Sequence, residues 1–320
     1  MASDLWVFLS QKLELRTAFR FPQLIYENGS LIPTVADLPP GEEEIGSLFT
    51  TGNMGEEAIL LAAGASDIPL TPFAFATDKV GVVLAAKGYS VSWQQLRRMI
   101  RLGLQSQIEN QQIDKVRFAI AQRLNRFAAY GEPALGHTGL FNNGRVTSVN
   151  SSFNPNTATY AQWVSFIIDM VLSSGLSNDG ETILSPTTLL MPQKMFVLAA
   201  QALNPINGTV TAIQAAMDRL QQQFGRDSLE IVVTPFSSSD LLERYRILPA
   251  ATNRDRLVIY TKDVSVLSRR IENKVAQMVD ERFLSPTQNL TRIFPFFSAA
   301  SATMIHDPSG VRYINTVKVA

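Results

Sequence analysis

One long helical segment constrains the fold of this chain more than any other feature. Between Ser92 and Tyr130, apolar residues recur at roughly helical spacing. These residues are Leu96, Ile100, Leu104, Ile108, Ile113, Val116, Ile120, Leu124 and Phe127. Ser92 and Gln95 match a capping box at the start, and Gly131 after Tyr130 is a typical helix end. The pattern predicts one helix of about 38 residues, roughly 57 Å long at ~1.5 Å per residue, which suits a strut better than a compact enzyme domain.

Charged residues are segregated in the first part of the chain, although the whole chain is neutral, with 28 basic and 28 acidic side chains. The stretch 21–78 contains no Lys or Arg and carries nine acids: Glu27, Asp37, Glu42, Glu43, Glu44, Glu56, Glu57, Asp67 and Asp78. The stretch 79–126 has only two acids and carries nine bases: Lys79, Lys87, Arg97, Arg98, Arg101, Lys115, Arg117, Arg123 and Arg126. Blocks of opposite charge steer association and fix register where they meet.

Two interpretations of these blocks stay open. Either they pack on each other, within one subunit or between neighbouring copies, or they form two independent solvated faces. If they meet between subunits, the residues expected at the contact are Glu42, Glu43, Glu44, Glu56, Glu57, Asp67, Arg97, Arg98 and Arg101. The neutral total argues against sequence-specific DNA binding, because proteins that contact many phosphates usually carry a basic surplus.

Pro and Gly interrupt the acidic stretch too often for a long regular element. Two short extended runs lie within it, over 57–62 and 70–77, with a candidate turn at 63–67 between them. Phe73 and Phe75 alternate with small residues, which is typical of a strand. We therefore expect residues 1 to about 80 to form an extended arm and a long two-stranded loop. An isolated ribbon is only marginally stable, so this loop needs a surface to pack on.

The rest of the chain alternates helical and strand patterns without a regular βαβ series, which favours a mixed α+β fold. Helices are predicted over 158–174 with Thr157 as the cap, from near Pro192, over 209–224 and over 275–282. Strands are predicted over 187–191, 229–234, 256–261, 291–304 and 311–317, with a turn at 307–310.

No catalytic or metal-binding pattern stands out. The chain has no cysteine and two histidines, His137 and His306, and it lacks the phosphate-loop, nucleophile-elbow and HExxH motifs. Gly136, Gly139 and Gly144 lack the preceding strand and the following capped helix of a phosphate-binding loop, so a plain turn is expected. We predict no enzyme activity, no cofactor and no metal. A hydrolase or dinucleotide enzyme without linear motifs is the alternative left open.

No segment is typical of a targeting signal or of a membrane span. The first residues include Asp4 and lack a long apolar core. No window reaches about 18 uncharged apolar residues, the rough minimum for a membrane-spanning helix. We expect no membrane partner.

Three segments carry a resemblance to a known family. They are LIPTVADLPPGEEEIGSLFTTGNMGEEAILLAAGASDIP (31–69), GYSVSWQQLRRMIRLGL (88–104) and AAYGEPALGHTGLFNN (128–143). They resemble a family of tailed-bacteriophage major capsid proteins, most specifically over residues 30 to 145. The order of arm, hairpin loop, long helix, turn, central α/β region and terminal strands is similar to the Hong Kong 97-type capsid fold, which encapsulin nanocompartments share.

The resemblance implies a shell subunit that assembles into pentamers and hexamers and encloses a phage genome in an icosahedral head. The implied parts are an N-terminal arm over 1–48, an extended loop over 49–80, a peripheral domain over 81–150 and 284–320 with a spine helix at about 92–130, and an axial domain over 151–283. The alternative is an encapsulin-like nanocompartment shell that encloses cargo enzymes.

Further copies of the chain are the first implied partner. A separate scaffolding protein, a portal and cement or decoration proteins are the others. Contact with packaged double-stranded DNA is expected to be weak and non-specific, because the chain has no net positive charge. The implied location is the virion capsid, after assembly in the cytoplasm of the bacterial host.

The sequence departs from some relatives in two respects. Some crosslink a lysine of the extended loop to an asparagine of a neighbour, but no lysine lies in 21–78, so this reaction is not expected here even though Asn273 lies in a suitable region. Some also begin with a long helical scaffolding segment that a protease removes. This chain enters its arm almost at once, so we expect a separate scaffolding protein or a segment already removed.

Overall fold

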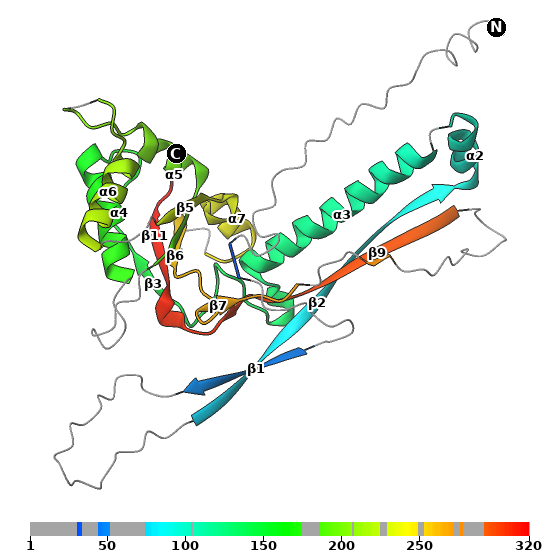
Figure 1. Cartoon of the computed structure of the whole chain (residues 1–320), viewed down its shortest axis with the longest axis horizontal. Coiled ribbons are helices and arrows are strands. Elements are labelled where there is room, and N and C mark those ends of the chain that lie inside the picture. Colours follow the sequence, from blue (N-terminus) through cyan, green and yellow to red (C-terminus); the bar gives the residue numbers. More distant parts are fainter. Residues whose placement is uncertain are drawn as a thin grey trace, which may run out of the picture.

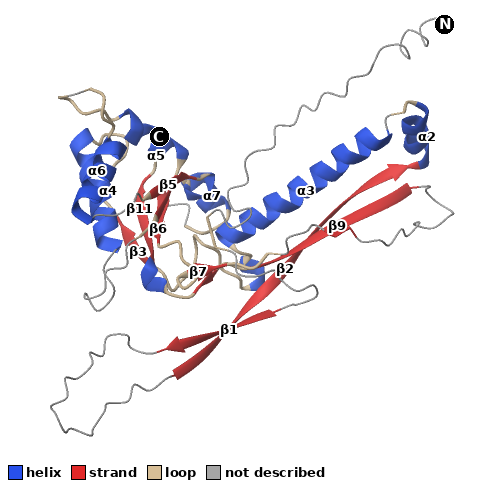
Figure 2. Cartoon of the chain, viewed as in Figure 1, coloured by secondary structure: helices blue, strands red, loops and turns tan. Residues whose placement is uncertain are grey.

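The structure combines a helix-flanked sheet at one end with a long, thin sheet and an elongated helix that extend away from it (Figure 1; helices and strands are separated by colour in Figure 2). This computed structural model describes residues 31–33, 44–51, 74–103, 105–174, 186–206, 208–224, 229–248, 253–271, 276–277 and 291–319. The prediction of a mixed α+β fold is confirmed.

A five-stranded mixed sheet forms the centre of the first part. In spatial order its strands are β3 (Thr147–Asn150), β11 (Val311–Val317), β6 (Arg254–Tyr260), β4 (Thr188–Met191) and β5 (Glu230–Val233). β11 is parallel to β3 and antiparallel to β6, and β4 is parallel to β5. β6 lies in the middle and is buried from Asp255 to Tyr260. A strand buried on both faces shows a continuous apolar run, as LVIY over 257–260 does here.

Alternate residues of β6 face two separate cores. Three helices cover the first face: α4 (Tyr160–Ser174), α5 (Gln193–Gln201) and α6 (Ala212–Phe224). There Leu257 and Ile259 share a core with Trp163. The second face is covered by the short helix α7 (Ser239–Arg244) and by the chain after the long helix, and its core includes Val258 and Tyr260.

The second sheet is built on β2 (Ala74–Ser92), a strand of 19 residues that spans about 60 Å at ~3.3 Å per residue. Its spatial order is β1 (Glu44–Thr51), β2, β9 (Thr291–Ser301) and β8 (Ala276–Gln277). β1 pairs with β2 from Ala74 to Gly81, and β9 pairs with β2 from Val82 to Ser92. β2 therefore changes partner between Gly81 and Val82.

The long helical segment is divided in two, so the prediction of one helix over 92–130 was wrong. The two helices are α2 (Trp93–Arg101) and α3 (Gln105–Tyr130). Between them Gly103 adopts φ +66°, a left-handed conformation that glycine enters without steric cost, and its N–H donates to Ile100 O at 3.0 Å. This is the geometry of a helix C-terminus. Figure 1 shows α2 at the far end of the molecule, turned away from the axis of α3.

One face of the β2–β9 ladder packs against α3. The shared core contains Val116, Ile120 and Leu124 of the helix with Ala85, Phe296 and Ala300 of the strands. Tyr89 stacks on Phe294 with ring centroids 4.8 Å apart. The helix therefore stiffens the β9-paired part of β2, as a strut is expected to do.

The C-terminal end of α3 is closed by the turn that follows it. Its last four backbone carbonyls all accept hydrogen bonds: Phe127 O from Gly131 N–H (2.8 Å), Ala128 O from Leu140 N–H (2.9 Å), Ala129 O from Phe141 N–H (2.8 Å) and Tyr130 O from Asn142 Nδ2 (2.8 Å). Thr303 Oγ1 also donates to Ala128 O, at 2.8 Å. The last four carbonyls of a helix have no partners within the helix, and this buried end has them supplied from outside.

The same turn is tied to the five-stranded sheet through buried polar groups. Arg256 donates from Nε to Asn315 Oδ1 at 2.9 Å and from Nη1 to Phe141 O at 2.5 Å. Its guanidinium lies 4.8 Å from the ring centroid of Tyr313, whose hydroxyl donates to Leu140 O at 2.6 Å. Burial lowers the pKa of Arg256 and raises the pKa of Tyr313. One turn thus joins α3 to β6 and β11.

Most other predicted elements are confirmed with shifted ends. The structure contains four of the predicted strands: β4 (predicted over 187–191), β5 (229–234), β6 (256–261) and β11 (311–317). It also contains three of the predicted helices: α4 (predicted over 158–174), α5 (from Pro192) and α6 (209–224). The strand over 291–304 is divided into β9 and β10 (Met304–Ile305), and β10 pairs with β7 (Leu267–Ser268). The described residues also include three short 3-10 helices: η2 (Pro133–Leu135), η3 (Pro235–Ser237) and η5 (Pro308–Gly310).

Two local predictions were wrong, and a third is only partly described. Thr159, not Thr157, caps α4, because Thr159 Oγ1 accepts from Gln162 N–H at 3.4 Å. The helix predicted over 275–282 is contradicted at 276–277, which form β8 on the edge of β9. Of the predicted two-stranded loop, residues 74–77 belong to β2, whereas 57–62 and the turn at 63–67 lie outside the described residues.

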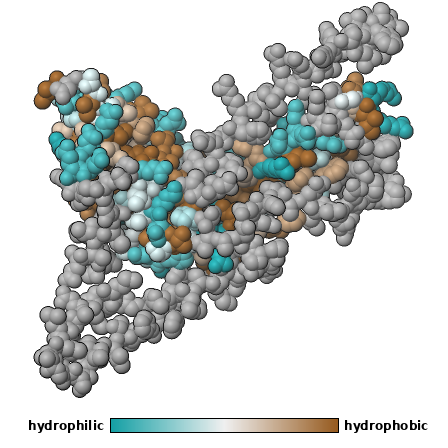
Figure 3. All heavy atoms as spheres, in the orientation of Figure 1, coloured by the Kyte–Doolittle hydropathy of each residue, from teal (hydrophilic) through white to brown (hydrophobic). Residues whose placement is uncertain are grey.

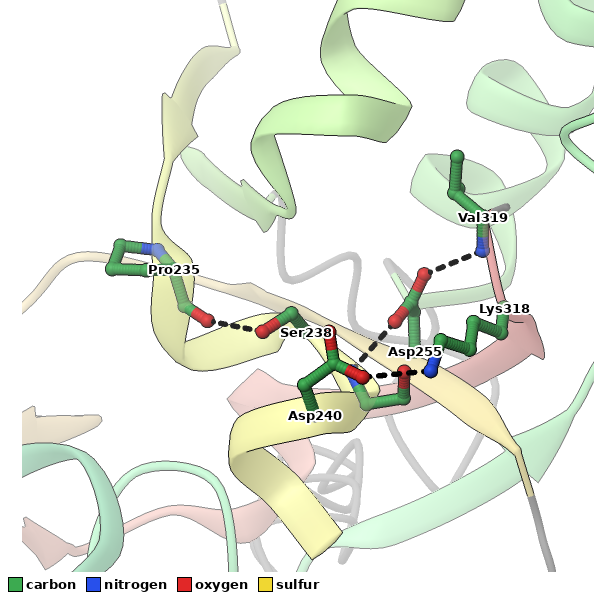
Figure 4. Close-up of polar contacts among 7 residues, drawn as sticks. Pro235, Ser238, Asp240, Asp255, Lys318 and Val319 are labelled. Carbon is green, nitrogen blue, oxygen red and sulfur yellow. Dashed lines mark hydrogen bonds and ion pairs between the residues drawn. The ribbon is translucent and has the colours of Figure 1, made fainter. Parts of the chain in front are cut away.

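A buried carboxylate fastens the end of the chain to β6. Asp255 Oδ1 accepts from Ser239 N–H at 2.7 Å, and Oδ2 accepts from Val319 N–H at 3.0 Å (Figure 4). Beside it Lys318 Nζ donates to Asp240 Oδ1 at 2.7 Å, at an exposed position. The hydrogen bond from Lys318 lowers the pKa of Asp240. The final strand β11 is therefore held at its end by one buried and one solvent-exposed contact.

We expect Asp255→Ala to destabilise the subunit by about 1–3 kcal/mol for each of the two N–H groups that lose their acceptor, because both lie in a buried site. The matched control is Asp240→Ala, which removes only the exposed pair with Lys318 and should cost less than about 1 kcal/mol. Urea unfolding followed by circular dichroism measures both. Equal losses for the two variants would contradict the assignment of Asp255 as the main fastening.

Gly139→Ala should destabilise the subunit by about 1–3 kcal/mol through overpacking, since a Cβ there would lie 2.5 Å from the carbonyl carbon and oxygen of Ala129. The backbone of Ala129 belongs to α3 and cannot move aside easily. Gly144→Ala is the control in the same turn region: its Cβ would meet nothing within 4 Å, so the change should stay within about 0.5 kcal/mol. Thermal unfolding of both variants tests the difference.

Candidate assembly surfaces

The helix α2 presents a basic surface at the far end of the molecule. Ser92 and Gln95 form the predicted capping box, with Gln95 N–H donating to Ser92 Oγ at 3.3 Å and Ser92 N–H to Gln95 Oε1 at 3.1 Å. Arg97, Arg98 and Arg101 are all exposed. Figure 3 shows hydrophilic side chains at the tip of the molecule where α2 lies. Because the chain turns at Gly103, these arginines lie on a separate short helix, α2, past the N-terminal end of α3.

The structure places Glu44, the one described acid of the expected contact set, far from this surface within one subunit. Glu44 begins β1 and pairs opposite Gly81, whereas Ser92, the N-cap of α2, lies 11 residues further along β2. At ~3.3 Å per residue this separation is about 36 Å. Glu42, Glu43, Glu56, Glu57 and Asp67 lie outside the described residues. The one acid of the set that is described is therefore out of reach of the arginines of its own chain.

A second exposed surface is the face of the β2–β9 ladder that points away from α3. Leu84 is 61% exposed on this face, next to the exposed Ala86 and Gly88. Opposite them in β9 lie Ala299 and Phe297, which are half-buried. The sequence carries no clear signal for this surface, because residues 82–90 do not alternate between apolar and polar types. An apolar sheet face of this kind is typical of a surface that another chain covers.

The glycine-rich segment after α3 is a closed turn, as predicted, and not an anion site. Gly131 and Gly136 adopt left-handed φ values of +67° and +73°. The N–H groups that a phosphate would need are used by the chain itself: Gly139 N–H donates to Asn142 Oδ1 at 2.5 Å, and Gly136 N–H donates to Pro133 O at 3.1 Å. The segment donates hydrogen bonds to the last carbonyls of α3 and so ends the helix.

Neither histidine belongs to a candidate metal site. His137 lies in the turn after α3 and His306 follows β10, where its Nε2 is 2.7 Å from Ser268 Oγ. Among the described residues, no group of three or more His, Asp or Glu side chains is arranged to hold a metal ion.

Within the part of the chain that the structure describes, no helix has both the length and the apolar composition needed to cross a membrane.

A short piece of the N-terminal region is built into the core of its own subunit. Leu31 and Ile32 are each 2% exposed and belong to the core on the α7 side of the five-stranded sheet. Leu31 O accepts from the Tyr260 hydroxyl at 2.9 Å, and Pro33 O accepts from Arg269 N–H at 3.0 Å. The sequence prediction of an extended arm did not include this anchor.

Comparisons with known proteins identify the family and the fold of the chain. Residues 56–317 match a family model described as Major capsid protein. No curated protein sequence matches the chain. The structure is similar to the capsid of Myoviridae Phage XM1, with TM-score 0.65 and 13% identity over 96% of this chain and 98% of the other. It is similar to a chain of Mycobacterium phage Ogopogo, with TM-score 0.57 and 13% identity over 97% and 98%.

A third similar structure is the capsid of an empty GTA particle, with TM-score 0.57 and 10% identity over 95% of this chain and 99% of the other. Identities this low show a shared fold, which is the Hong Kong 97-type capsid fold expected from the sequence. The matched family is a structural one and not a class of enzymes. Because the match is to major capsid proteins, the encapsulin-like alternative is less supported. The family model covers most of the chain, which therefore belongs to the major capsid protein family of tailed-phage head shells.

Proposed function

We propose that this chain builds an icosahedral head from pentamers and hexamers, with four parts that make different contacts. Residues 1–48 act as an N-terminal arm and residues 49–80 as an extended loop. Residues 81–150 with 284–320 form a peripheral domain around α3, and residues 151–283 form an axial domain around the symmetry axes. The chain acts only as a structural subunit in this proposal, without a catalytic site, cofactor or metal.

The observation that carries the proposal is the unsupported ribbon made by β1 and the first part of β2. β1 is an edge strand, and the residues of β2 that pair with it, Ala74 to Gly81, pair with no other described strand. Two-stranded ribbons are marginally stable alone. A neighbouring copy that covers the ribbon would supply packing that the described part of its own subunit does not.

We further propose that the acidic and basic blocks meet between copies. Glu42, Glu43, Glu44, Glu56, Glu57 and Asp67 of one copy would face Arg97, Arg98 and Arg101 of another. The separation of about 36 Å between Glu44 and the start of α2 supports a contact between copies over one within a chain. Such a contact fixes register and partner choice more than it adds affinity.

Residues 31–33 attach the proposed arm to the core of its own subunit. With Leu31 and Ile32 buried in the subunit's own core, the residues before them would make the reach to a neighbour. The burial of two large apolar side chains contributes about 1.5–3 kcal/mol each. This is enough to hold the base of the arm while its contacts with other copies change.

Other partners follow from the role of a head subunit. We propose a separate scaffolding protein, a portal and cement or decoration proteins, with assembly in the cytoplasm of the bacterial host. Contact with packaged double-stranded DNA is expected to be weak, because the chain carries no net positive charge.

We expect the purified protein, alone or co-expressed with its scaffold, to form closed shells, tubes or capsomer rings. Negative-stain electron microscopy and sedimentation velocity measure this directly. A monodisperse monomer under both conditions would overturn the proposal that the chain builds shells.

Reversal of the three α2 arginines, Arg97→Glu, Arg98→Glu and Arg101→Glu together, should abolish or strongly reduce assembly while the subunit stays folded. The three side chains are exposed, so their loss removes no core packing. Sedimentation reports assembly, and circular dichroism reports folding.

Two further variants make this experiment specific. The control replaces three exposed bases on other helices by glutamate: Arg117, Lys194 and Arg219. It changes the net charge by the same amount as the α2 reversal and should leave more assembly than that reversal does. Combining the α2 reversal with Glu42→Arg, Glu43→Arg and Glu44→Arg should restore assembly in part. Normal shells from the α2 triple variant would contradict the charge-pairing proposal.

A further inference from the structure

The direction of the β1–β2 ribbon is set at one point of the described structure. β2 is paired with β1 up to Gly81 and with β9 from Val82 onwards, on the opposite edge. No described strand pairs across both halves of β2. The ribbon is therefore joined to the body through a single strand at this change of partner, where a strand bends and twists more easily than inside a sheet.

The ring of His137 occupies the space beside Gly81. A side chain on Gly81 would begin with a Cβ that overlaps Cε1 and Nε2 of His137, and it would lie 3.2 Å from Nδ1. On its other side, the His137 ring makes an edge-on contact with the ring of Phe127, with centroids 6.2 Å apart and planes at 79°. The imidazole thus fills the gap between β2 and the end of α3.

The position of His137 is fixed relative to α3. Its backbone N–H donates to Glu132 O at 3.1 Å, and its carbonyl accepts from Glu132 N–H at 3.0 Å, which forms an isolated bridge. Glu132 is in turn paired with Arg123 of α3. The turn that carries His137 also supplies donors to the last carbonyls of the helix. Because the ring is fixed to the end of α3 and lies against Gly81, it fixes the position of β2 relative to the helix end.

Gly81 is held from the β9 side as well. Ala302 N–H donates to Gly81 O at 3.3 Å, just after the last residue of β9. The glycine lies between this hydrogen bond and the His137 ring. Two restraints from different elements act on one residue, at the position where β2 leaves the body.

We propose that His137 is a positioning residue, whose ring sets the direction of the β1–β2 ribbon relative to α3. Gly81 is part of this arrangement, because the His137 ring occupies the space that a side chain on residue 81 would need. Removing the ring leaves β2 free to bend towards the vacated space, and adding a Cβ at Gly81 displaces the ring. Its importance for shell geometry rests on the proposed function, but the positioning itself is a property of one subunit.

Distance measurements by pulsed electron paramagnetic resonance test this proposal. The chain has no cysteine, so Thr50→Cys on β1 and Gln122→Cys on α3 place two spin labels without background. Labelled protein is diluted with unlabelled protein, so that only pairs within one subunit are detected. We expect a narrow distance distribution for the parent chain, a broadened and shifted one with His137→Ala, and a shifted one with Gly81→Ala.

Two variants separate positioning from general loosening. His306→Ala removes the other histidine, next to Ser268, and should leave the distribution unchanged. His137→Phe keeps a ring of similar size and should restore the narrow distribution, and it replaces His137→Ala if that variant does not fold. A His137→Ala distribution that superimposes on the parent, or an equal change with His306→Ala, would overturn the proposal. The readout does not require shells, so it is independent of the assembly experiments.

Discussion

The closure of the C-terminal end of α3 is the interaction on which the rest of the structure depends. Four consecutive carbonyls at a buried helix end would each cost about 1–3 kcal/mol if left without a donor. The turn after Gly131 supplies those donors, and its own carbonyls at Leu140 and Phe141 accept from Tyr313 and Arg256 of the five-stranded sheet. The end of the helix is therefore fixed to the five-stranded sheet by buried polar contacts in addition to the apolar core that the two share.

This arrangement divides the molecule into a stable centre and long extensions. Among the described residues, the two cores beside the five-stranded sheet contain most of the large buried side chains, whereas the core between α3 and the β2–β9 ladder has six buried residues. In the same part of the chain, β1 and residues 74–81 of β2 pair only with each other. Because the described residues of the extensions bury few apolar side chains, these elements are expected to open at a lower free energy than the centre.

The sequence predicted the elements whose signals are local. The capping box at Ser92 and the continuous apolar run of β6 follow from residue types at fixed spacings, and both are confirmed. The break at Gly103 was missed because the apolar spacing continues through it, so periodicity outweighed the low helix propensity of one glycine. The 19 residues of β2 were only partly identified, since each half pairs with a different strand from a distant part of the chain. The contact of His137 with Gly81 has no sequence signal, because it depends on tertiary structure alone.

Charge placement follows the same division between centre and extensions. In the centre, the buried cations Arg256 and Arg269 donate to backbone carbonyls, and Arg256 also donates to an amide oxygen. On the extensions, acids begin the ribbon at Glu44 and arginines stand on α2, about 36 Å apart along β2. At that distance, several Debye lengths at physiological salt, charges on one subunit scarcely interact. The separation of Glu44 from the α2 arginines therefore contributes little to the folding of one chain, and the proposed role of these charges lies between copies.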